Sequence, residues 1–144
     1  MKAHEVIRGY IRDLSRRHDW SSLVDHSANG HSGSWKNVMI NLLNDLPDAA
    51  TAEVFTPLLS RPGCRIERIV SQGQSTPSHE PYRQAHDEWV LLLKGAARVA
   101  LEGREVALQP GDTLFIPAHT EHWVTFTDPE VASVWLAIHF EAAT

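Results

Sequence analysis

The stretch from Glu88 to His122 constrains the fold of this chain more than any other feature. Glu88 opens an apolar run that ends at the turn residue Gly95, and Gly111 begins a second segment in which Pro117 and then His122 follow at short spacing. A carboxylate that opens one strand and an imidazole that opens another, each at a fixed distance from a turn glycine, are typical of a small antiparallel barrel with ligands converging inside it. The sequence therefore predicts a site, without indicating a substrate.

Short apolar runs separated by turns continue from residue 41 to the end of the chain. They recur about every 8 to 12 residues, which is the spacing found in β-sandwiches and β-barrels. We therefore predict an all-β barrel over residues 41–144. Its expected strands are residues 52–59, 64–71, 88–93, 97–101, 104–108, 113–116, 122–127 and 134–140.

Residues 1–40 follow a different pattern. Ile7, Tyr10, Ile11 and Leu14 recur at helical spacing, which predicts an amphipathic α-helix. Residues 21–36 are rich in Ser, Gly, Asn and His, as is typical of a loop or linker. An amphipathic helix needs a surface that covers its apolar stripe. We therefore expect an N-terminal α-helical extension docked on the barrel or on a second subunit.

Composition and charge argue against several classes of partner. The 144 residues fit one domain, and a net charge of -5 without a basic stripe argues against nucleic acid. No apolar stretch has the length of a membrane span, and the N-terminus lacks the apolar core of a signal peptide. Cys64 is the single cysteine and cannot form an internal disulfide. We expect a cytoplasmic protein whose partner is a small molecule, not nucleic acid or a membrane.

The spacing of these motifs resembles that of the cupin superfamily. The first cupin motif reads Gly-x5-His-x-His-x3,4-Glu-x6-Gly, and Glu88 and Gly95 match its second half. The second motif reads Gly-x5-Pro-x-Gly-x2-His-x3-Asn, and Gly111, Pro117 and His122 match it. The resemblance covers roughly residues 65–140. It implies the cupin fold, a double-stranded β-helix or jelly-roll barrel.

The chain departs from the second motif at two positions, where His119 replaces a glycine and Phe126 replaces the asparagine. The first motif departs more, because its two histidines are missing. Counting back from Glu88 by the family spacing places Tyr82 and Gln84 at those positions.

A second frame for the first motif counts forward from the preceding glycine. It places His79 at the first histidine position, but Pro81 fills the second and the gap to Glu88 is too long. We prefer the first frame, because Gln84 retains an oxygen donor and Tyr82 has the same strand parity.

The resemblance implies that Gln84, Glu88 and His122 bind a divalent metal ion. One imidazole, one carboxylate and a neutral oxygen suit Zn, Mn, Fe or Ni less tightly than three histidines would. Structural interpretations also exist: Glu88 could be an exposed strand-edge residue or pair with Arg83, and His122 could be a hydrogen-bonded core histidine. A lone buried carboxylate is costly unless it is paired, neutralised or bound to a cation, which favours the ligand role.

Several other residues are candidates for the same site. Tyr82, His79 and His119 could move protons in catalysis. His119 could instead be a second ligand, a group behind the ligands or a substrate contact. His86 shares strand parity with the candidate ligands if the chain stays extended. His139 is expected to be a core histidine, with a role in the site as the alternative.

Two classes of function are compatible with these residues. The first is an enzyme in which the metal acts as a Lewis acid on a small oxygen-bearing metabolite, and the resemblance implies lyase, isomerase or dioxygenase chemistry. The second is a non-catalytic binding or sensing module with a vestigial metal site, in which Trp89, Trp123 and Trp135 form the pocket or subunit contacts. The fold alone does not separate the two.

Two structural expectations follow. We expect Glu88 and His122 on adjacent strands, with side chains that converge inside the barrel. We also expect a homodimer, because an apolar outer face is predicted at Trp89, Leu91, Leu93 and Trp135.

Overall fold

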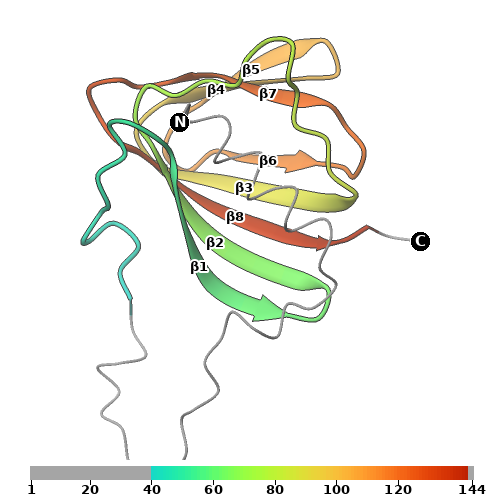
Figure 1. Cartoon of the computed structure of the whole chain (residues 1–144), viewed down its shortest axis with the longest axis horizontal. Coiled ribbons are helices and arrows are strands. Elements are labelled where there is room, and N and C mark those ends of the chain that lie inside the picture. The colour runs from blue at the N-terminus through green and yellow to red at the C-terminus, as the bar shows by residue number, and fades with distance from the viewer. Residues whose placement is uncertain (1–39, 143–144) are drawn as a thin grey trace, which may run out of the picture.

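The computed structural model describes residues 40–142, and every regular element in this part of the chain is a β-strand. The strands form two antiparallel sheets that face each other, and the five-stranded sheet lies below the three-stranded one in Figure 1. The all-β prediction is therefore confirmed. The predicted N-terminal helix and linker lie outside the described residues. Within residues 40–142, no helix is long and apolar enough to cross a membrane.

The order of strands places the last strand, β8, in the middle of the larger sheet, between β2 and β3. The five-stranded sheet has the order β1 (Val54–Arg61), β2 (Cys64–Ser71), β8 (Ser133–Glu141), β3 (His86–Lys94) and β6 (Thr113–Ile116). The three-stranded sheet has the order β5 (Arg104–Leu108), β4 (Ala97–Leu101) and β7 (His122–Thr127). β1 lies later than expected, because a bulge between Pro57 and Leu59 lets this edge strand continue past the proline.

The space between the sheets is filled by alternate side chains of both. The buried apolar cluster consists of Val90, Leu92, Trp135 and Ala137 from one sheet and Ala97, Val99 and Leu108 from the other. Trp135 was expected on the outer face of the barrel, and this prediction was wrong. Its side chain lies in the core, where its indole Nε1 donates to Ser71 Oγ at 3.2 Å. Trp89, Leu91 and Leu93 are partly buried. The homodimer stays a prediction.

One row of paired residues at the end of this core positions the polar side chains. Arg65 on β2 pairs with His139 on β8, which pairs in turn with Glu88 on β3. Directly paired residues on antiparallel strands point to the same face of a sheet. His139 shares one face of β8 with Ala137 and Trp135, because side chains alternate along a strand. Ala137 and Trp135 lie in the buried apolar cluster, so this face is the inner one. The strand register therefore brings two charges and an imidazole together inside the barrel.

His122 reaches the same place from the other sheet. Glu88 lies on β3 and His122 on β7, so the expectation of adjacent strands was wrong. The chain crosses from β6 in the five-stranded sheet to β7 in the three-stranded sheet between the two motif positions. Their side chains therefore converge across the barrel interior, not along one sheet.

Candidate functional site

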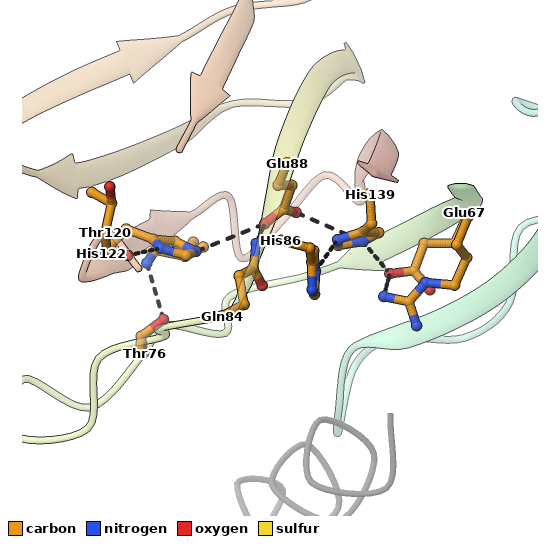
Figure 2. Close-up of polar contacts among 10 residues, drawn as sticks. Glu67, Thr76, Gln84, His86, Glu88, Thr120, His122 and His139 are labelled. Atoms are coloured by element: carbon orange, nitrogen blue, oxygen red, sulfur yellow. Dashed lines mark hydrogen bonds and ion pairs between the residues drawn. The ribbon is translucent and has the colours of Figure 1, made fainter. Parts of the chain in front are cut away.

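Glu88 lies at the centre of the polar cluster shown in Figure 2 and is 8% exposed. Its Oε2 accepts a hydrogen bond from Gln84 Nε2 at 2.6 Å and lies 3.9 Å from His122 Nε2. Its Oε1 lies 3.9 Å from His139 Nε2. The carboxylate therefore stands between two imidazoles that come from different sheets. A buried carboxylate in an otherwise apolar strand is costly without such partners.

The hydrogen bonds of His122 fix the polarity of its ring. His122 is 5% exposed, and its Nδ1 lies 3.0 Å from the backbone carbonyl oxygen of Thr120. A carbonyl oxygen only accepts, so we assign the proton of the neutral ring to Nδ1. The lone pair on Nε2 then faces Glu88. This is the tautomer in which a histidine binds a metal ion or accepts a hydrogen bond from a ligand.

Tyr82 holds His122 from the other side through its backbone and its ring. The two residues form an isolated β-bridge, with N–H to O distances of 2.9 and 3.1 Å, and their rings stack at 5.5 Å. Burial raises the pKa of the Tyr82 phenol, and the carboxylates of Glu53 and Glu88 raise it further, against a hydrogen bond from Thr76 that lowers it. The phenol therefore stays protonated near neutral pH and can serve as a donor.

A second group of polar side chains adjoins Glu88 on the β2 side. We had not predicted from the sequence that these side chains would contact one another. His139, which is 7% exposed, places Nε2 at 2.9 Å from Glu67 Oε1 and Nδ1 at 3.0 Å from His86 Nε2. Arg65 Nη2 lies 3.5 Å from the same Glu67 oxygen. Figure 2 shows His86, His139 and Glu67 beside Glu88. The available signal was the alternation of Arg65 and Glu67 in an apolar strand, which places two charges on one face.

His86 is the partly exposed end of this second group. Burial lowers its pKa to about 4, with His139 and Arg65 acting in the same direction and Glu88 and Glu67 against it. The ring is therefore neutral at pH 7. A neutral ring carries one proton and one lone pair. The contact with His139 occupies Nε2 of His86 and leaves Nδ1 for other partners.

Two of the candidate site residues have exposed side chains. His79 has a side chain that is 78% exposed, and its Nε2 lies 3.4 Å from Glu80. The His119 side chain is exposed, but its backbone serves the site: its N–H donates to the carbonyl of Gln84 at 2.6 Å. Gln84 contacts Glu88 as the first motif frame expects, while the His79 side chain of the second frame is largely exposed.

The backbone of His119 explains why the cupin motif has a glycine at this position. Its φ is 64°, in the left-handed region that costs a non-glycine residue about 1 kcal/mol. We therefore expect His119→Gly to raise the free energy of unfolding by about 1 kcal/mol in urea denaturation. His79→Gly is the matched control at an exposed histidine without positive φ, and it should be neutral or destabilising. Equal effects of both substitutions would contradict this explanation.

The donors around Glu88 fit a weakly held divalent ion. Glu88 supplies a carboxylate, His122 supplies an Nε2 lone pair, and Gln84 supplies an amide that already contacts Glu88. Both nitrogens of His139 face other side chains. Within the part of the chain that the structure describes, no three His, Cys, Asp or Glu residues form a group that could hold a metal ion. A divalent ion at this place would therefore have two strong ligands and one weak one, in contrast to a tight three-histidine centre.

Comparisons with known proteins agree with this fold. The chain matches the family model described as "Cupin domain" over residues 67–139. It is 43% identical to a Ralstonia eutropha JMP134 protein provisionally named mannose-6-phosphate isomerase, whose crystal structure aligns with a TM-score of 0.70 over 72% of this chain and 98% of that one. Among curated proteins, none matches the chain.

Two more distant structures have the same architecture. A cupin superfamily protein from Desulfitobacterium hafniense DCB-2 is 20% identical, with a TM-score of 0.57 over 67% of this chain and 84% of that chain. An RmlC-like cupin from Desulfovibrio desulfuricans is 16% identical, with a TM-score of 0.60 over 73% of this chain and 97% of that chain. At these identities the similarity supports the fold alone.

Proposed function

This chain belongs to the cupin superfamily, and we propose that it is an enzyme that acts on a small oxygen-bearing metabolite at Glu88. The observation that carries the proposal is the burial of this carboxylate between the Nε2 atoms of His122 and His139, each 3.9 Å away. Well-packed apolar residues would stabilise a barrel interior as well as or better than such a charged cluster. Buried titratable groups that face each other are therefore candidates for function.

The proposed chemistry is of the isomerase type. The provisional name of the 43% identical relative supports this choice among the reactions that cupins perform. Gln84, Glu88 and His122 would hold a divalent ion, which when bound would polarise an oxygen of the metabolite as a Lewis acid. Tyr82 would donate a hydrogen bond or a proton to such an oxygen, since its raised pKa keeps the phenol protonated.

A binding or sensing role is the second candidate. It is favoured by the engagement of both His139 nitrogens, with Glu67 and with His86, which leaves one imidazole lone pair directed at Glu88. In that case the cluster would recognise a small molecule without turning it over. The metal content of the protein separates the two proposals.

We expect purified protein to contain a divalent metal ion, and Glu88→Gln to lower that content by roughly tenfold or more, because a ligand is lost. Elemental analysis after dialysis measures this directly. Glu121→Gln makes the same substitution at an exposed residue next to His122 and should leave the content unchanged. Wild-type protein without metal would favour the binding role. Equal metal in wild type and Glu88→Gln would refute the proposed ligand set.

A further inference from the structure

A row of apolar side chains crosses the outer face of the five-stranded sheet (Figure 1). Trp89 alternates along β3 with the inward-facing Glu88 and Val90, so it points away from the site and the core. Strand pairing places it in line with one apolar residue from each of the other four strands. This outer row consists of Leu59, Ile66, Ile138, Trp89 and Phe115.

The side chains of the outer row are only partly covered. Phe115 is 47% exposed and Leu59 is 37% exposed, and the other three side chains are partly exposed. Leu91 and Leu136 pair with each other on the same face and extend the apolar surface along the strands. Single apolar side chains are normal on a protein surface, but a contiguous patch marks an interaction site. This face therefore fits an apolar partner.

Ile40, where the described part of the chain begins, lies beside the outer row. Arg68 is two residues from Ile66 on the same face of β2, which corresponds to about 7 Å. Its Nη1 donates to the backbone carbonyls of Leu42 at 3.3 Å and of Asn44 at 3.2 Å, and Ile40 lines the same pocket as Arg68. The N-terminal segment is therefore joined to the barrel next to this face.

The N-terminal segment has a stripe of matching character and length. The sequence predicts an amphipathic helix with Ile7, Tyr10, Ile11 and Leu14 on one side. As a helix, residues 3–17 would be about 22 Å long. The outer row crosses four spacings between strands and is about 19 Å long. Residues 18–39, as a flexible connection, would span about 25 Å, which is enough to reach the row from Ile40.

We propose that the apolar stripe of residues 3–17 docks on the outer row of its own chain. An amphipathic helix is stabilised when its apolar side packs against a sheet face. The homodimer expected from the sequence would use the same face, so a second copy competes with the segment. The connection gives the segment an effective concentration in the millimolar range, so the segment occupies the row when the protein is micromolar.

Paramagnetic broadening of NMR signals in the full-length chain tests this docking. A nitroxide on Arg12→Cys, in a Cys64→Ser background, would lie on the polar side of the predicted helix. We expect the amide of Ile66 and the indole N–H of Trp89 to lose intensity. The indole of Trp123 belongs to the three-stranded sheet, about 10 Å further away, and should keep most of its intensity. Equal broadening of both indoles, or of neither, would overturn the proposal.

A mixed sample separates docking within one chain from docking on a second copy. Nitroxide-labelled protein without the NMR isotope is mixed with isotope-labelled protein that carries no nitroxide. Docking within one chain leaves the Ile66 and Trp89 signals of this mixture sharp. Broadening of these signals in the mixture would show that a second copy supplies the segment, and would overturn the proposal.

Substitutions on each side of the proposed contact test its chemistry. Ile11→Ser removes an apolar residue from the stripe and should weaken the broadening at Trp89, whereas Arg16→Ser on the polar side should not. Phe115→Ser should weaken it from the sheet side. Val131→Ser is its matched control, because Val131 is 44% exposed and lies between β7 and β8, outside the outer row. Unchanged broadening in Ile11→Ser and Phe115→Ser would overturn the proposal. If a variant fails to fold, the labelled protein and the mixed sample still decide.

Discussion

Replacing Glu67 with alanine is expected to lower the free energy of unfolding by roughly 3–5 kcal/mol, the range seen when one member of a buried charged pair is removed. The side chain is 2% exposed and lies within 3.5 Å of both His139 and Arg65. The substitution takes away a carboxylate that lies 3.5 Å from the buried Arg65 guanidinium. It also leaves His139 Nε2 without the acceptor it has in the native protein.

Urea denaturation of Glu67→Ala and Glu67→Gln measures the effect. Glutamine keeps an oxygen that can accept from His139, so it should cost only about 1.5–3 kcal/mol, the order of one hydrogen bond to a charged group. If Glu67→Ala lost less free energy of unfolding than Glu67→Gln, the Arg65–Glu67–His139 contacts would contribute little to stability.

Gly95→Ala should cost about 3 kcal/mol or more, from backbone strain together with overpacking. Gly95 has a φ of 86° at the crossing from β3 to β4, between the two sheets. A Cβ placed there would lie 2.5 Å from Ser133 Oγ and 2.7 Å from Ser133 Cα. The second of these atoms belongs to the backbone of β8, so a side-chain rotation does not relieve the clash.

Gly103→Ala provides the matched control. Gly103 has a φ of 74°, but a Cβ there would meet nothing within 4 Å. It should therefore cost only the strain, about 1 kcal/mol. Thermal and urea unfolding of both variants give the comparison. Equal losses would show that close packing against Ser133 does not explain the glycine of the first motif.

Much of the fold could be predicted from the sequence because its signals are local. Turn residues and strand-length apolar runs set the bounds of β2 (Cys64–Ser71) and of β4 to β7 as expected. β1 was expected at residues 52–59 and lies at Val54–Arg61, because the bulge between Pro57 and Leu59 has no local signal in the sequence. Trp135 was placed on the wrong face because both faces of β8 are apolar, so alternation gives no direction.

Only the part of the candidate site that depends on local sequence signals could be predicted. Glu88 and His122 belong to spaced motifs, and the structure brings them to 3.9 Å. Glu67, His86 and His139 meet because β8 pairs with both β2 and β3 in a particular register. That register joins residues more than fifty positions apart, and single-strand periodicity does not specify it.

The most direct test of the proposed metal site is anomalous diffraction from crystals grown with zinc. We expect an anomalous peak at about 2.0–2.2 Å from both Glu88 and His122 Nε2, the usual zinc–ligand distances. The Glu88→Gln variant should lose that peak while retaining the fold. Zinc found only at exposed histidines such as His79 and His119, with none at Glu88, would contradict the central claim.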